Sequence, residues 1–156
     1  MPETSLVARS PLDIRFVPES IDIATELTFE MGRRRVFDAL LHIGAWWPKR
    51  SQPGAGIVFE PYVGGRFFES WDDGNGVLLG HVSKLVTPDA FAITGPLGLE
   101  GPVHGTWNVW LEAVEQSRTL LRGRHRAFGA IDESAQAVTV AGWELTYARL
   151  RQYLEA

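Results

Sequence analysis

Residues 59–85 contain the pattern that most restricts the fold of this chain. Two runs of aromatic, aliphatic and β-branched residues flank the segment Asp72-Asp73-Gly74-Asn75-Gly76. Asp, Asn and Gly adopt the positive φ of tight hairpin turns at low steric cost. Upstream, Gly64-Gly65 enters a strand, and such a pair is typical of a bend or of a close approach of two backbones. The pattern therefore predicts an antiparallel hairpin in a sheet that bends.

Hydrophobic periodicity predicts the other elements. Apolar and polar residues alternate over residues 21–30, which indicates a half-buried strand. Helical spacing follows up to about His42 and returns over residues 136–154. Further strands are predicted at residues 57–60, 90–94, 106–113 and 118–127. Hairpin strands with helices on one side predict an α+β fold. We expect a curved antiparallel sheet of six to seven strands, one or two short helices after the first strand, and a long C-terminal helix.

The chain length predicts one domain. At 156 residues with 45% hydrophobic content, the chain can bury a sizeable core. We expect an N-terminal arm at residues 1–20, where Leu12, Ile14 and Phe16 alternate, and a single domain at residues 21–156. The last helix should lay Val140, Trp143, Tyr147, Leu150 and Leu154 on the sheet. Its second stripe contains Val138, Ala141, Leu145 and Ala148 and leaves room for a dimer contact, so we expect a monomer or a homodimer.

Composition excludes several classes of partner. A net charge of −4 argues against a nucleic-acid surface, which normally carries a basic excess. There is no cysteine, hence no disulfide and no thiolate ligand. No apolar run approaches the ~18 residues of a membrane span, and Met1–Ser20 does not resemble a signal peptide. We therefore expect a cytoplasmic protein without nucleic-acid or membrane partners. The histidines lack ligand spacing, so no metal and no cofactor are expected.

The strand from Arg118 to Ala127 shows which of its faces is buried. Four arginines, Arg118, Arg122, Arg124 and Arg126, share one face, which must contact solvent. His125 therefore points inward. In the earlier strand, Glu69 lies between Phe67 and Trp71 on one face, and the opposite parity would place Arg66 inside instead. The sequence leaves this choice open.

Several short motifs together resemble the START-like (SRPBCC, helix-grip) superfamily and, within it, the family named after the activator of heat-shock protein 90 ATPase. The similarity covers about residues 21–154. The motifs that carry it are Trp46-Trp47-Pro48, Phe59-Glu60-Pro61, Gly64-Gly65-Arg66-Phe67, Gly80-His81-Val82, Gly105-Thr106-Trp107, and Gly142-Trp143 with Leu150 and Leu154. The resemblance implies a curved sheet that grips the C-terminal helix, with a cavity between them that often holds a hydrophobic ligand.

Inward aromatic residues are the main candidates to line such a cavity. The chain has six tryptophans, and bulky rings on a curved sheet favour a pocket between them. The predicted ligand-binding residues are Trp46, Trp47, Phe67, Glu69, Trp71, His81, Trp107, His125, Trp143 and Tyr147. His104 is placed in a loop, residues 95–105, that could open and close. Each tryptophan could equally be ordinary core.

Glu69 and His125 are the candidates for chemistry. A glutamate and a histidine in an apolar pocket could act as general acid and base or hydrogen-bond a ligand. In the alternative interpretation, Glu69 pairs with Arg66 or another arginine at the sheet edge, and His125 is a satisfied core histidine. The first functional hypothesis is binding of a small hydrophobic or aromatic molecule. The second is an enzyme of the polyketide cyclase, dehydratase or hydrolase kind. The third is an interaction protein similar to the chaperone-ATPase activators.

Overall fold

A computed structural model describes residues 18–48, 51–115 and 117–156 of the chain. Two short 3-10 helices, Ile43–Ala45 and Asp72–Gly74, accompany nine larger elements. These are β1 (Glu19–Phe29), α2 (Arg33–Leu41), β2 (Gly56–Phe59), β3 (Arg66–Ser70), β4 (Gly76–Val86), β5 (Ala90–Thr94), β6 (Val103–Glu115), β7 (Arg118–Gly129) and α3 (Glu133–Glu155). The order of strands and helices is the predicted one.

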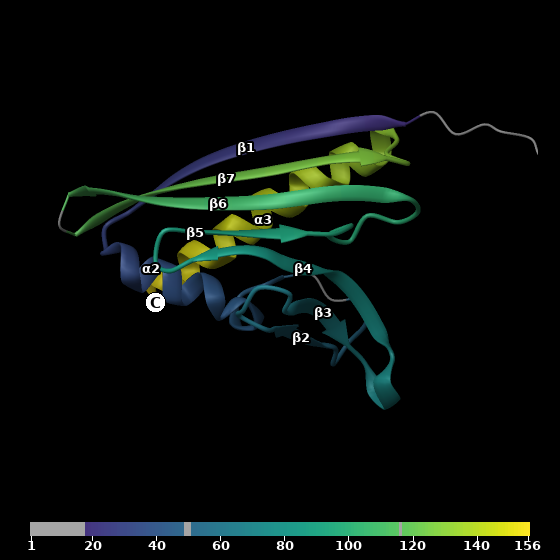
Figure 1. Cartoon of the computed structure of the whole chain (residues 1–156), viewed down its shortest axis with the longest axis horizontal. Coiled ribbons are helices and arrows are strands. Elements are labelled where there is room, and N and C mark those ends of the chain that lie inside the picture. Colours follow the sequence, from purple (N-terminus) through teal and green to yellow (C-terminus); the bar gives the residue numbers. More distant parts are fainter. Residues whose placement is uncertain (1–17, 49–50, 116) are drawn as a thin grey trace, which may run out of the picture.

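All seven strands form one antiparallel sheet in the order β1-β7-β6-β5-β4-β3-β2. The sheet is curved, and α3 crosses one of its faces (Figure 1). Helix α2 lies beside the C-terminal end of α3, where the Arg35 guanidinium donates to the Leu154 carbonyl over 3.1 Å. This arrangement confirms the α+β helix-grip fold.

The predicted hairpin joins β3 to β4. Its turn is the 3-10 helix Asp72–Gly74, in which Asp73 and Gly74 have φ of 59° and 79°. The Asn75 side chain donates to the Asp72 carbonyl over 2.9 Å. The predicted close approach at the glycine pair is also present, because a Cβ on Gly65 would lie 2.0 Å from the Glu60 carbonyl oxygen. Steric constraints on the backbone thus explain why Asp, Asn and Gly occur in this turn and why Gly occurs at position 65.

A β-bulge in β4 changes which of its side chains point inward. Phe67 pairs with Gly80 and Phe68 pairs with Leu78, so Leu79 is the extra residue. Beyond the bulge the parity is reversed, as expected when one residue is inserted. The prediction that His81 lies on the inward face with Leu79 is therefore wrong, because His81 is exposed.

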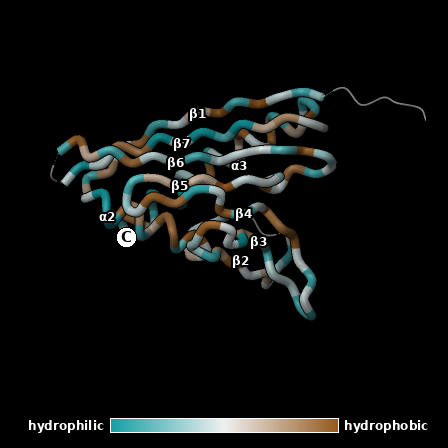
Figure 2. Tube along the Cα trace, viewed as in Figure 1, coloured by the Kyte–Doolittle hydropathy of each residue, from teal (hydrophilic) through white to brown (hydrophobic). Residues whose placement is uncertain are grey.

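Aromatic rings fill the space between the sheet and α3. The Trp47 ring lies 5.0 Å from Phe67 and 5.9 Å from both Trp107 and Trp143, measured between ring centroids. Trp107 and Trp143 are 4.8 Å apart. Apolar and polar residues alternate along β1, as Figure 2 shows, because alternate side chains face this core.

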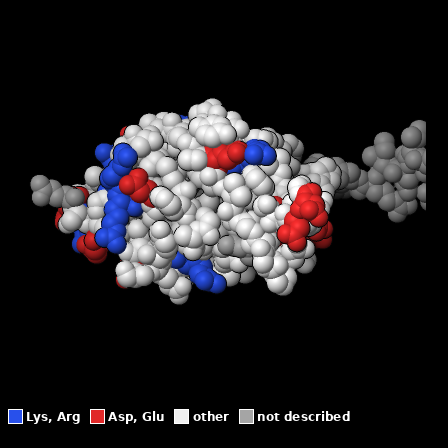
Figure 3. Space-filling model, turned by 90° about the horizontal axis from the view of Figure 1, so that it is seen from below, with Lys and Arg blue, Asp and Glu red and all other residues white. Residues whose placement is uncertain are grey.

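The arginine face of β7 is exposed, as predicted, and carries ion pairs to both neighbouring strands. Arg124 lies 2.7 Å from Asp22 of β1, and Arg122 lies 3.3 Å from Glu26 of β1 and from Glu112 of β6. Acidic residues therefore balance the basic ones locally. The face in Figure 3 is mostly uncharged, with its charged side chains in a few separate groups.

The C-terminal helix differs from its prediction at one position. Trp143, Tyr147, Leu150 and Leu154 are buried as expected, but Val140 is 43% exposed. Thr139 and Thr146 are buried in addition, and their hydroxyls are satisfied because they donate to the carbonyls of Ala135 and Gly142 in the preceding turn. The second stripe, Val138, Ala141, Leu145 and Ala148, is exposed.

The start of β1 differs from the predicted start of the domain. Glu19 and Ser20 belong to β1, so the strand begins two residues before the predicted start of the domain. Residues 1–17 of the predicted arm, including Leu12, Ile14 and Phe16, lie outside the described residues. Within the described part of the chain, no helix is both long and apolar enough to cross a membrane.

Candidate functional site

A cavity of about 450 Å³ lies beside Glu69, and we call it the Glu69 pocket. Three parts of the chain form its wall: the segment after α2, strands β3 and β4, and the loop between β5 and β6. Most of the lining side chains are apolar. The lining residues are Trp47, Pro48, Ser51, Glu69, Val77, Leu78, Leu79, Pro96, Leu97, Gly98, Leu99 and Glu100.

Glu69 is only 4% exposed, so Glu69 and not Arg66 lies on the inward face of β3. Arg66, at the start of the same strand, points outward and forms an ion pair with Glu60 at 2.9 Å. The alternative interpretation, a Glu69–Arg66 pair, is therefore wrong. Side chains an odd number of residues apart on a strand face opposite ways, so only one of Arg66 and Glu69 can be inside.

Protein hydrogen bonds hold the Glu69 carboxylate in place. The Ser51 backbone N–H donates to Oε1 over 2.6 Å, and the Ser51 hydroxyl donates to Oε2 over 2.9 Å. The Trp71 indole N–H donates to Oε1 over 3.0 Å. A carboxylate offers about four acceptor positions, so these donors occupy most of them. Glu69 thereby fastens the loop around Ser51 to β3.

The same bonds set the ionisation of Glu69. Burial raises the pKa of a carboxyl group, but hydrogen bonds from the Trp71 indole, the Ser51 hydroxyl and the backbones of Ser51 and Gln52 outweigh it. The pKa of Glu69 is therefore below its ordinary value. Glu69 is an ionised acceptor at neutral pH, which is unlike a general acid.

His125 lies elsewhere in the core, on β7, with β4, β5 and β6 between it and β3 in the sheet. It is 2% exposed and points inward as predicted. Its Nδ1 accepts a 2.8 Å hydrogen bond from the Trp143 indole N–H. Glu69 and His125 are therefore bonded to separate parts of the protein.

A second buried polar contact joins β6 to α3. The Trp107 indole N–H donates to the Tyr147 hydroxyl over 3.1 Å. Burial raises the pKa of Tyr147 to about 12, although hydrogen bonds with Trp107 and Thr25 oppose the rise. Gly123 on β7 makes room for this hydroxyl, since a Cβ there would lie 2.1 Å from it.

The ten predicted ligand-binding residues do not gather in one cavity. Trp47 and Glu69 line the Glu69 pocket, and Trp143 and Tyr147 line a groove of about 500 Å³ between β1 and α3. Trp71 is half-buried beside Glu69, and His81 is on the outer face. The remaining four, Trp46, Phe67, Trp107 and His125, are buried core residues. Ligand binding by these side chains stays a prediction.

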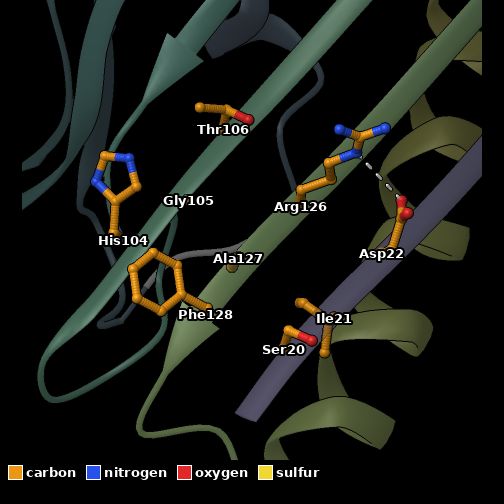
Figure 4. A pocket seen from close by; sticks show the side chains of 9 residues that line it. All are labelled: Ser20, Ile21, Asp22, His104, Gly105, Thr106, Arg126, Ala127 and Phe128. Carbon is orange, nitrogen blue, oxygen red and sulfur yellow. Dashed lines mark ion pairs between the residues drawn. The ribbon is translucent and has the colours of Figure 1, made fainter. Parts of the chain in front are cut away.

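The outer face of the sheet has a hollow of about 450 Å³ over β1, β7 and β6 (Figure 4). His104 and Phe128 lie together at one end with their rings 6.1 Å apart, and Arg126 reaches Asp22 at the other. His104 belongs to β6 and is exposed, so its predicted place in the loop at residues 95–105 is wrong.

Sequence reasoning missed the contribution of Ser51, Leu97 and Leu99. No pattern in the sequence marks Ser51 as a donor, although a buried carboxylate requires donors nearby. The loop that contains Leu97 and Leu99 does line the pocket, but nothing in the sequence distinguishes these two leucines. Among the described residues, no three His, Asp or Glu side chains are grouped so that they could hold a metal ion.

Solved structures of similar fold are numerous. Protein SA2116 of unknown function from Staphylococcus aureus has 15% identity and a TM-score of 0.66, with 88% of this chain and 95% of that chain covered. CalU16 from Micromonospora echinospora has 15% identity and a TM-score of 0.61, covering 90% and 85%. Ara h 8.0201 has 12% identity and a TM-score of 0.64, covering 87% and 98%. At such low identity these similarities show the fold alone.

Sequence comparison gives a family. A family model described as "Activator of Hsp90 ATPase homolog 1-like protein" matches residues 30–155, from the end of β1 to the end of α3. Curated proteins gave no match.

Proposed function

The chain belongs to the Activator of Hsp90 ATPase homolog 1-like family, and we propose that it binds a small hydrophobic or aromatic molecule in the Glu69 pocket. The helix-grip fold is compatible with hydrophobic ligand binding. The observation that carries the proposal is the pocket itself, whose wall is apolar except for a few polar side chains.

The dimensions and the lining of the Glu69 pocket support this. Its volume of about 450 Å³ lies within the range of roughly 300–1,000 Å³ that is common for small-molecule sites. Trp47 offers an aromatic surface, and Leu79 and Leu97 offer aliphatic ones. Burying such surface yields about 25 cal/mol per Å² of apolar area, which favours an apolar ligand.

The state of Glu69 favours a binding protein over an enzyme. A general acid or base needs a proton-transferring atom within reach of the substrate. The Glu69 carboxylate is ionised and accepts from Ser51 and Trp71, so its lone pairs are already directed at the protein. We assign it the task of holding the pocket wall in place.

Native mass spectrometry of gently purified protein is the first test. A discrete non-covalent mass that disappears on denaturation is the expected result, and it also reveals the chemical class of the ligand. The same spectrum counts subunits. A ligand found in that experiment can then be titrated into the stripped protein by calorimetry.

A pair of matched variants localises the site. Leu99→Asp introduces a charge into the lining of the Glu69 pocket, whereas Leu145→Asp introduces it on the exposed face of α3. We expect the first to lower affinity at least about tenfold, because burying a charge against an apolar ligand is costly, and the second to leave affinity unchanged. Equal affinities for the two folded variants would refute the assignment of the site.

A further inference from the structure

One short segment forms a wall of two cavities. Leu97, Gly98, Leu99 and Glu100 line the Glu69 pocket, and the same four residues line a second cavity of about 380 Å³. We call the second cavity the Thr139 pocket. Its other wall is the start of α3 and the residues before it, namely Ala130, Asp132, Ser134, Ala135, Val138 and Thr139. The two cavities are thus separated by a single turn of chain.

Leu97 is the buried residue of that turn. It is 8% exposed and belongs to the hydrophobic core, while Gly98 and Glu100 are exposed. Its backbone N–H donates to the Leu79 carbonyl over 2.9 Å, and the Leu99 N–H donates to the Pro96 carbonyl over 3.0 Å. These bonds hold the backbone of the turn in place, and with it the position of Leu97 between the two pockets.

The backbone of Leu97 is strained. Its φ of 51° lies in the left-handed region, which leucine rarely adopts, and Gly98 beside it has a φ of 90°. Such conformations cost free energy and persist where the surroundings enforce them, often at functional sites. A glycine at position 97 would adopt the same φ without strain. The backbone conformation of the turn therefore does not explain a leucine at position 97, and its side chain must.

We propose that Leu97 divides one elongated binding site into two chambers and so sets the length of the ligand that the protein accepts. This inference rests on the proposed function of the Glu69 pocket. The ligand class is an aromatic or alicyclic body in the Glu69 pocket with a chain directed at Leu97. The Thr139 pocket, with Ser134 and Asp132 in its wall, is the extension that opens when the Leu97 side chain is small.

A homologous series of ligands tests this. The probes are phenols with a linear butyl, hexyl, octyl or decyl chain in the para position, titrated by calorimetry. In the unmodified protein, affinity rises with chain length until the chain meets Leu97 and then levels off. In Leu97→Gly the rise continues to longer chains, at about tenfold per two methylene groups.

Two further variants keep the test decisive if Leu97→Gly does not fold. Leu97→Ala should shift the limit to longer chains by less, and Leu97→Phe should shift it to shorter chains. Leu145→Ala, on the exposed face of α3 and outside both cavities, is the control and should leave the limit in place.

The outcomes separate the two proposals. The same limit in the folded Leu97 variants and in the unmodified protein would overturn the role of Leu97 and leave the proposed function intact. Failure of every probe to bind either protein would count against the Glu69 pocket as the binding site and against the inference with it.

Discussion

The indole nitrogen of Trp143 on α3 donates a 2.8 Å hydrogen bond to Nδ1 of His125 on β7, and both side chains are buried. The bond joins the long helix to β7, the strand next to the edge strand β1. It also fixes the tautomer of the neutral imidazole, because Nδ1 must present its lone pair to the indole N–H and therefore carries no proton.

Trp143→Phe should destabilise the protein by about 1–3 kcal/mol, since it removes the donor and leaves a buried acceptor unsatisfied. Urea unfolding measures the change. Trp110→Phe is the control: Trp110 is 42% exposed on the outer face, and its replacement should change the free energy of unfolding by less than about 0.5 kcal/mol. Equal effects of the two substitutions would contradict a stabilising role of this bond.

Gly123→Ala should destabilise the protein because its Cβ would lie 2.1 Å from the Tyr147 hydroxyl. Overpacking of a core typically costs about 1–3 kcal/mol. Removing the hydroxyl should relieve the clash, so the double variant with Tyr147→Phe should lose less stability than the sum of the two single variants. A double-mutant cycle in urea measures this coupling. Strict additivity would show that the two groups are not in contact.

The raised pKa of Tyr147 predicts a loss of stability at alkaline pH. Its pKa is raised by burial from 10.0 in the unfolded chain to about 12, so the folded protein favours the neutral phenol. This contribution is fully present below pH 10 and is lost as the pH rises from 10 to about 12. Unfolding free energies of the unmodified protein and of Tyr147→Phe should therefore converge over that window. Tyr153→Phe, at an exposed position, is the control.

The lowered pKa of Glu69 predicts a loss of stability at acidic pH. Its pKa in the folded protein lies below the ordinary value of 4.5, so the carboxylate stabilises the folded state above about pH 4.5, and the contribution is lost as the pH falls through the folded pKa. Glu69→Gln should cost about 1–3 kcal/mol at neutral pH, because an amide group then faces donors from Ser51 and Trp71.

The difference between Glu69→Gln and the unmodified protein should shrink on acidification, as measured by urea unfolding at several pH values. Glu100→Gln, which lies in the same pocket wall but is exposed, should show little effect. A constant difference from neutral to acidic pH would mean that the ionised form of Glu69 is not what the hydrogen bonds stabilise.

Strand positions and most side-chain faces were predictable because they depend on local chemistry. Alternation has a period of two residues in any strand, so the arginines of β7 placed His125 inward without knowledge of its neighbours. The Asp, Asn and Gly cluster predicted the β3–β4 turn for the same reason, since backbone sterics act between adjacent residues.

The candidate site was less predictable because it depends on contacts between distant parts of the chain. Besides Trp71, a donor to Glu69 is Ser51, which is 18 residues away and on a loop. His81 faces outward because one extra residue in β4 reverses the parity, and no local pattern marks that bulge.

The elements, their order and the polarity of their faces are encoded locally, since each follows from a few neighbouring side chains. Which of the inward aromatic residues meet is a property of the folded chain. Trp47, Trp107 and Trp143 pack together and fill the space between the sheet and α3, and the cavities lie around them. Packing depends on the shapes of side chains from the whole chain at once, and hydrophobic patterning does not contain that information.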